Sequence, residues 1–160
     1  YVLVAQDVAA EAPTGVRSRL FAWLWRPRRG RPILGYGGFW LMVGEAHIST
    51  IAIAPDWRGM GLGEHLLLEL AEHAIQLGAE MITLEVRLSN LPAQKLYEKY
   101  GFEYVGRRKR YYRDNNEDAH IMTVENVQAP EYRALLDQQR LKLKERLSQQ
   151  EQHNRAVISE

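Results

Sequence analysis

A glycine-rich turn between a strand-like segment and a helix-like segment is the first feature with chemical meaning. It reads Arg58-Gly59-Met60-Gly61-Leu62-Gly63-Glu64 and follows an isoleucine-rich run that ends at Ala54-Pro55. Backbone N–H groups in such a turn, together with the dipole of the following helix, bind phosphate. The turn therefore predicts a phosphate-bearing ligand, and the alternative is a tight turn that serves packing alone.

Two common phosphate-binding motifs do not fit this spacing. A Walker loop requires Gly-Lys-Ser/Thr, whereas Gly63 is followed by Glu64 and His65. The dinucleotide fingerprint requires a glycine three residues after Gly61, where Glu64 stands. The remaining pattern, Arg58-x-x-Gly61-x-Gly63, resembles the pyrophosphate loop of the GNAT acetyltransferase family.

The later part of the chain carries the same resemblance, over roughly residues 33–124. Its motifs follow one another in the order that GNAT proteins show: Leu84-Glu85-Val86-Arg87-x-Ser89-Asn90, Ala93, Leu96-Tyr97 and Tyr100-Gly101-Phe102. Two further motifs are Arg107-Arg108-x-x-Tyr111-Tyr112 and Glu117-Asp118-Ala119-x-x-Met122. Together they resemble the bacterial enzymes that acetylate the N-terminal alanine of a small-subunit ribosomal protein.

This resemblance implies acetyl-CoA as the co-substrate. It implies Glu85 as proton acceptor, Tyr97 as proton donor, and Tyr111 and Tyr112 beside the acceptor peptide. It also implies a set of contacts to acetyl-CoA, namely Ile51, Ala52, Ile53, Arg58, Gly59, Met60, Gly61, Leu62, Gly63, Glu64 and Asn90. The histidines show no metal-binding spacing such as HExxH, so we expect no metal site.

Amine acetylation suits these residue types. An α-amine has a reference pKa of about 8, so a base must remove a proton at neutral pH, and Glu85 can do so. The alternative for Glu85 is a surface ion pair with Arg87. A phenol such as that of Tyr97 can protonate a departing thiolate, and its alternative is a packed helix tyrosine. Glu45 and His47 are second-choice bases.

An oxyanion also forms in this chemistry and requires a donor. A backbone N–H group from residues 51–53 can supply it if that strand bulges away from its neighbour. No covalent intermediate on the protein is required, which agrees with the absence of cysteine from the chain.

An α/β layer fold must position these groups. We expect strands at 1–6, 33–43, 47–53, 81–87, 102–107 and 120–124, and helices at 62–77 and 91–100. Asn90 is placed to begin the second helix, and Gly78 and Gly101 to end the two helices. The resemblance implies the GNAT fold, a mixed, mostly antiparallel sheet with splayed central strands and helices on both faces.

The expected domain organisation is a GNAT domain at 1–127 and a helical C-terminal tail at 128–160. The domain contains an insertion at 9–32 and a cofactor core at 33–124, and the tail has too thin an apolar stripe to belong to the core. Because Tyr1 is not Met and opens a strand-like run, we expect that an N-terminal segment is missing.

Composition excludes several classes of protein. A net charge of +1 gives no global field for nucleic acid or a membrane surface, and the lack of cysteine excludes disulfides and is compatible with the cytoplasm. The apolar runs at 20–25 and 39–43 are too short to span a bilayer. The aromatic run at 21–25 either folds onto the domain or rests on a membrane surface. The basic segment 107–113 either binds RNA or an acidic peptide, or is a solvated hairpin.

The sequence therefore predicts a cytoplasmic enzyme that transfers the acetyl group of acetyl-CoA to the N-terminal α-amine of a protein. The expected acceptor is the alanine of a small-subunit ribosomal protein. Two alternatives stay open: acetylation of a lysine or small amine, and a non-catalytic module that binds acyl-CoA or docks on the ribosome.

Overall fold

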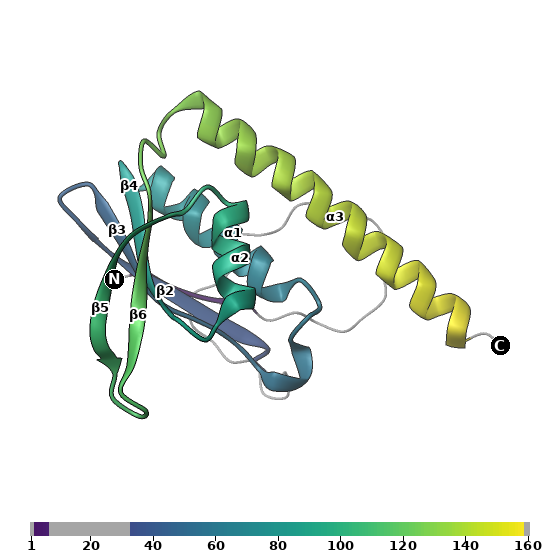
Figure 1. Cartoon of the computed structure of the whole chain (residues 1–160). Coiled ribbons are helices and arrows are strands. Elements are labelled where there is room, and N and C mark those ends of the chain that lie inside the picture. The colour runs from purple at the N-terminus through teal and green to yellow at the C-terminus, as the bar shows by residue number, and fades with distance from the viewer. Residues whose placement is uncertain (1, 7–32, 159–160) are drawn as a thin grey trace.

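The computed structural model describes the backbone of residues 2–6 and 33–158 (Figure 1). The expected insertion at 9–32, with its aromatic run, lies outside the described residues. Six strands form one sheet: β1 (Val2–Gln6), β2 (Gly35–Met42), β3 (Glu45–Ile53), β4 (Met81–Arg87), β5 (Glu103–Tyr112) and β6 (Glu117–Val124). Their order is β1-β2-β3-β4-β6-β5, and β3–β4 is the one parallel pair among them. The prediction of a mixed, mostly antiparallel sheet is confirmed.

The two central strands separate, as predicted. The pairs between β3 and β4 run from Glu45–Met81 to Ile48–Leu84 and then stop, although β3 continues to Ile53 and β4 to Arg87. On the other side of β3, the register with β2 shifts between Gly38 and Phe39, so Ser49 has no paired residue on β2 in the strand register. Such a bulge bends a strand and increases its twist, and it lies at the point where β3 leaves β4.

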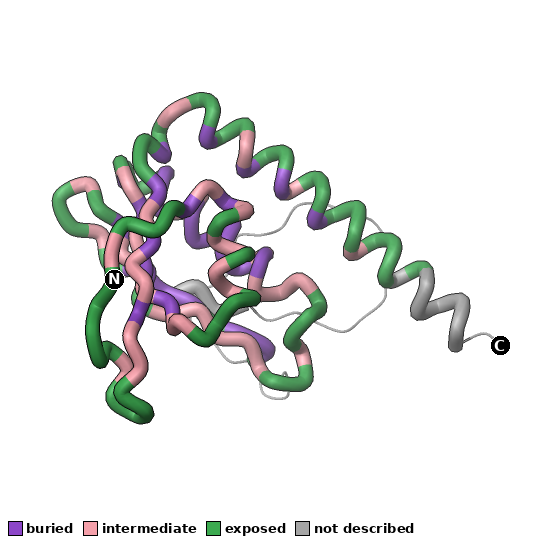
Figure 2. Tube along the Cα trace, in the orientation of Figure 1, coloured by how far each residue is buried: buried purple, intermediate pink, exposed green. Residues whose placement is uncertain are grey.

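The described helices all pack on one face of the sheet, so the prediction of helices on both faces is not met by the described part of the chain. These helices are α1 (Leu62–Gln76), α2 (Leu91–Lys99) and α3 (Pro130–Ile158), and a short 3-10 turn at Pro55–Trp57 precedes α1. In Figure 1 all three helices lie to the same side of the strands, and Figure 2 shows buried positions concentrated where α1 meets the sheet. Along β4, Ile82, Leu84 and Val86 are buried in the core cluster that also contains the α1 leucines, so Glu85 and its alternate neighbours lie on the opposite face.

Local signals in the sequence begin and end the helices where predicted. Asn90 begins α2, because its Oδ1 atom accepts a hydrogen bond from the Ala93 N–H at 3.3 Å. Gly78 and Gly101 follow the ends of α1 and α2 with φ of +87° and +81°, a conformation that favours glycine.

Helix α3 packs more deeply than predicted. Tyr132, Leu136 and Leu143 are 7%, 2% and 3% exposed, and the first two belong to the main core cluster. The expectation that this segment lies outside the core was wrong, because Tyr132 and the half-buried stem of Arg140 widen its thin leucine stripe. Neither α3 nor any other described helix is long and apolar enough to cross a membrane.

Candidate active site

Glu85 occupies the point where β3 and β4 part. It is the first β4 residue beyond the last pair between the two strands, and its side chain is only 5% exposed. Its Oε2 atom lies 2.6 Å from Nε2 of His47 on β3, and its Oε1 atom lies 2.8 Å from Nε of Arg108 on β5. The carboxylate is thus buried, a histidine and an arginine flank it, and strands on both sides hold it in place.

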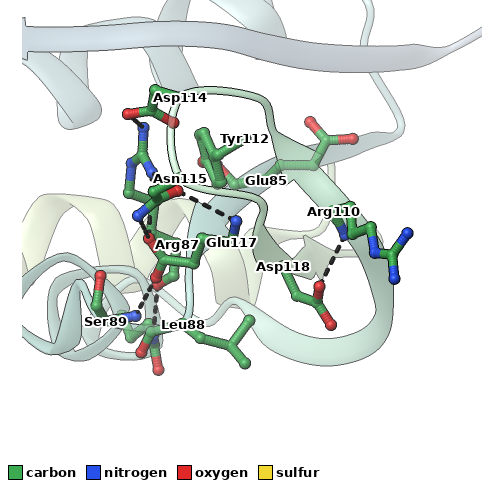
Figure 3. Close-up of polar contacts among 11 residues, drawn as sticks. Glu85, Arg87, Leu88, Ser89, Arg110, Tyr112, Asp114, Asn115, Glu117 and Asp118 are labelled. Atoms are coloured by element: carbon green, nitrogen blue, oxygen red, sulfur yellow. Dashed lines mark hydrogen bonds and ion pairs between the residues drawn. The ribbon is translucent and has the colours of Figure 1, made fainter.

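The simpler interpretation of Glu85 as the partner of Arg87 was wrong. Arg87 instead donates to Asp114 at 2.8 Å and to Glu117 at 3.1 Å, both at the tip of the β5–β6 hairpin. Figure 3 shows Arg87 directed toward these acidic residues. Its guanidinium also lies 3.8 Å from the centre of the Tyr112 ring. Glu85 and Arg87 therefore serve separate networks on the same face of the sheet.

Most of the basic segment 107–113 belongs to strand β5, which runs to Tyr112. Strand β5 continues to Tyr112, beyond the predicted end at Arg107, because Asp118 binds it twice. Its Oδ1 atom accepts from the Arg110 N–H at 2.7 Å, and its Oδ2 atom pairs with Arg107 at 2.5 Å. The register shifts between Arg108 and Tyr112, so the strand bulges just before the two tyrosines.

Both tyrosines of the hairpin lie close to Glu85. The Tyr112 hydroxyl donates to the Glu85 backbone carbonyl at 3.4 Å. Burial and the charge of the neighbouring Glu85 carboxylate raise the pKa of the Tyr111 phenol. The structure thus brings together three of the residues that the sequence singled out, Glu85, Tyr111 and Tyr112.

Glu117 links the hairpin to the turn before α2. Its Oε1 atom accepts from the Ser89 N–H at 2.7 Å, and its Oε2 atom accepts from Arg87 and Asn115 (Figure 3). The hydrogen bonds from Ser89, followed by those from Asn115 and Arg87, lower the pKa of Glu117 to about 2. The carboxylate is therefore ionised at neutral pH and fixes the turn that carries Asn90.

Tyr97 lies on α2, on the helical side of the sheet. Its ring packs against Phe102 with 5.8 Å between ring centres. Burial and, secondarily, the nearby Tyr112 raise the pKa of Tyr97 to about 12. The phenol therefore keeps its proton at neutral pH and can act as a donor. Tyr97 is also partly buried and packs against the core cluster. Its interpretation as a packed helix tyrosine is therefore compatible with its interpretation as a proton donor.

Beyond the parting of the strands, β3 offers a backbone edge. Ile51, Ala52 and Ile53 pair with β2 on one side, while their other edge has no strand partner in the described part of the chain. The predicted bulge occurs at Ser49, just before these residues and not within them. An extended ligand could pair with backbone N–H and C=O groups of this edge.

The glycine turn has the geometry of an anion site. Gly59 and Gly61 have φ of +77° and +83°, and Gly61 begins α1 without a side-chain cap. The first N–H groups of a helix have no partner within it, so those that follow Gly61 are available to a ligand. A Cβ atom built on Gly59 would meet no atom within 4 Å, so a ligand has room beside this residue. Arg58 holds the turn, because its Nε atom donates to the Ile53 carbonyl at 3.1 Å.

The side chain of Glu64 has a structural role that the sequence did not indicate. It is 7% exposed and forms ion pairs with Lys99 of α2 and with Arg146 of α3, and it accepts from the Tyr100 hydroxyl at 3.1 Å. Burial raises the pKa of Glu64, but the hydrogen bonds and charges of Lys99 and Arg146 outweigh that effect and lower it overall. Arg146 lies 82 positions away in sequence, so no local pattern could have found it.

No metal site accompanies these groups in the part of the chain that the structure describes: no three His, Asp or Glu side chains gather around a common point.

Comparisons with known proteins identify the family of this chain. The acetyltransferase (GNAT) family model matches residues 7–102. A Bacillus subtilis protein, provisionally named ribosomal protein bS18-alanine N-acetyltransferase, is 48% identical over 92 residues, which are 58% of this chain and 61% of that protein. The Escherichia coli K12 ribosomal protein bS18-alanine N-acetyltransferase is 40% identical over 86 residues, which are 52% and 58% of the two chains.

A solved structure gives the same result. The ribosomal-protein-S18-alanine N-acetyltransferase from Escherichia coli superposes with a TM-score of 0.55 at 34% identity, covering 62% of this chain and 65% of that one. The present chain thus spans about three fifths of the length of these relatives. The glycine turn, the parted strands and the family match lead to one conclusion: the chain belongs to the GNAT acetyltransferase family.

Proposed function

We propose that this protein transfers the acetyl group of acetyl-CoA to the N-terminal α-amine of a protein, with the alanine of a small-subunit ribosomal protein as acceptor. The observation that carries the proposal is the buried Glu85 carboxylate at the parting of β3 and β4. Relatives at 40–48% identity carry names for this activity, one of them provisionally, and the motif around Glu85 lies in the matched region.

The residues present fit acetyl-CoA. Gly59, Gly61 and Gly63 have no Cβ atom, so a phosphate group can approach the N–H groups at the start of α1. The free edge of β3 at 51–53 can pair with an extended amide chain, and Asn90 lies at the start of α2, three residues beyond the end of β4. Acetyl-CoA would supply the activated acetyl thioester.

The catalytic roles follow from the positions of the proton-carrying groups. Glu85 removes a proton from the acceptor ammonium, so that the nitrogen can form its bond to the acetyl carbon. A backbone N–H of the 51–53 edge donates to the carbonyl oxygen while it bears charge. Tyr97 keeps its proton at neutral pH and donates it to the sulfur as the carbon–sulfur bond breaks. Tyr111 and Tyr112 line the acceptor side next to Glu85.

The test is acetyl transfer from acetyl-CoA to a short peptide that begins with alanine, with the N-terminally blocked peptide as control. We expect transfer to the free peptide alone, and a kcat about 100-fold lower for Glu85→Gln, the usual contribution of a general base. Transfer to a blocked peptide that contains lysine would favour the lysine acetyltransferase alternative. Coenzyme A binding without transfer to any amine would leave a binding module in place of an enzyme.

A further inference from the structure

Helix α3 lies beside the glycine turn. A Cβ atom built on Gly61 would lie 3.2 Å from methyl carbons of Leu143 and Leu147 and 3.3 Å from Nη2 of Arg146. Residues 130–158 of α3 lie beyond the 7–102 segment that matches the family. An element outside the family match therefore places a guanidinium beside the proposed phosphate-binding turn.

The charges around Arg146 leave an excess of positive charge. Its Nη2 atom pairs with Oε2 of Glu64 at 2.5 Å, while Lys99 pairs with the other carboxylate oxygen. One carboxylate thus faces two cations whose side chains are 45% and 33% exposed. A guanidinium has five N–H donors in a planar fork, so Arg146 can hold Glu64 with one nitrogen and present the others to a second anion.

The position of Arg146 is set by packing and not by a loose tail. Leu143, one helical turn before it, is 3% exposed, and its side chain lies 3.2 Å from the position of a Cβ atom built on Gly61. Arg140 on the same helix pairs with Glu72 and lies 3.6 Å from Glu69, both on α1. These contacts hold α3 along α1, and the helix carries Arg146 to the start of α1.

We propose that Arg146 is a phosphate ligand of the acyl-CoA site, contributed by the C-terminal helix. The proposal rests on the proposed function, which places phosphate groups at the N–H groups after Gly61. Arginine suits phosphate because its fork donates two parallel hydrogen bonds. Lys99 keeps Glu64 neutralised while Arg146 turns toward the ligand, so the approach of a phosphate does not strand a buried carboxylate.

The test is the affinity for coenzyme A itself, measured by titration calorimetry on the wild type, Arg146→Gln and Lys142→Gln. We expect Arg146→Gln to bind coenzyme A about tenfold or more weakly, the usual effect of removing a hydrogen bond to a charged group. Lys142→Gln is the matched control: it removes one positive charge from an exposed position of α3 and leaves the Arg140 and Arg146 ion pairs with α1 in place, so its affinity should equal that of the wild type. Melting temperatures show whether both variants remain folded.

Dephospho-coenzyme A, which lacks the 3′-phosphate, identifies the group that Arg146 binds. An equal loss on both ligands assigns Arg146 to the pyrophosphate, and a loss confined to coenzyme A assigns it to the 3′-phosphate. If Arg146→Gln fails to fold, Arg146→Lys replaces it, since it keeps the charge but lacks the fork.

Two results would overturn the proposal. Unchanged affinity in a folded Arg146 variant would mean that the residue only pairs with Glu64. Tighter binding would mean that α3 shields the turn and opposes the ligand. A wild type that binds no coenzyme A would overturn the proposed function as well, and that outcome differs from a wild type that binds while its variant is indistinguishable from it.

Discussion

Alanine substitutions at the three glycines of the turn test its backbone conformation and its contact with α3 in one series. Gly59 has φ of +77° and open space around a built Cβ atom. Gly59→Ala therefore costs only the left-handed conformation, about 1–2 kcal/mol in the free energy of unfolding. Gly63 lies within α1, where a Cβ atom would be 3.7 Å from Ile53 in ordinary contact. Gly63→Ala should stabilise the protein by about 0.5–1 kcal/mol.

Gly61→Ala should be the most damaging of the three. It has φ of +83°, and its Cβ atom would also press on Leu143, Leu147 and Arg146 at 3.2–3.3 Å. Crowding of this kind adds about 1–3 kcal/mol to the conformational cost. Urea unfolding followed by far-ultraviolet circular dichroism gives the order of stability, which we expect to be Gly63→Ala, wild type, Gly59→Ala and Gly61→Ala. Equal stability of Gly59→Ala and Gly61→Ala would refute the contact between α3 and the turn.

Three further predictions concern the site. Tyr97→Phe should lower kcat about 100-fold with little change in the KM for acetyl-CoA, because it removes a proton donor and keeps the packing; an unchanged kcat would exclude Tyr97 as the acid. His47→Ala should lower kcat about tenfold by removing a hydrogen bond to Glu85, whereas His47→Gln, which keeps an N–H donor, should retain more activity; equal losses in the two variants would contradict this role. Glu117→Gln should lower the melting temperature at neutral pH. That difference should shrink as the pH falls from 4.5 toward about 2, since the folded-state pKa of Glu117 is depressed over that range; a difference that persists at the lowest pH would point to lost packing.

The local order of the fold was predictable because short-range chemistry determines it. The alternation of residues 82–87 placed Glu85 on the face opposite the core, and Asn90 and Gly101 delimited α2. The glycine-rich sequence of the turn suits its backbone conformation, since two of its glycines adopt positive φ. In each case the signal and the structure lie within a few residues of one another.

The partners of the charged residues were not predictable, because they come from distant strands and helices. Glu85 finds His47 and Arg108 and not its strand neighbour Arg87, since alternation places Arg87 farther along the same face, at the hairpin tip. The docking of α3 was missed for a similar reason. A thin leucine stripe suffices when Tyr132 and two arginine ion pairs with α1 support it.

The Glu117 carboxylate joins two parts of the site that would meet different substrates. It belongs to the hairpin that carries Tyr111 and Tyr112, and it binds the turn that carries Asn90. A peptide that moves the hairpin therefore also moves the start of α2, where acetyl-CoA is proposed to bind. We therefore expect the affinities for the two proposed substrates to be coupled through one side chain, so that variants of the hairpin change both KM values together.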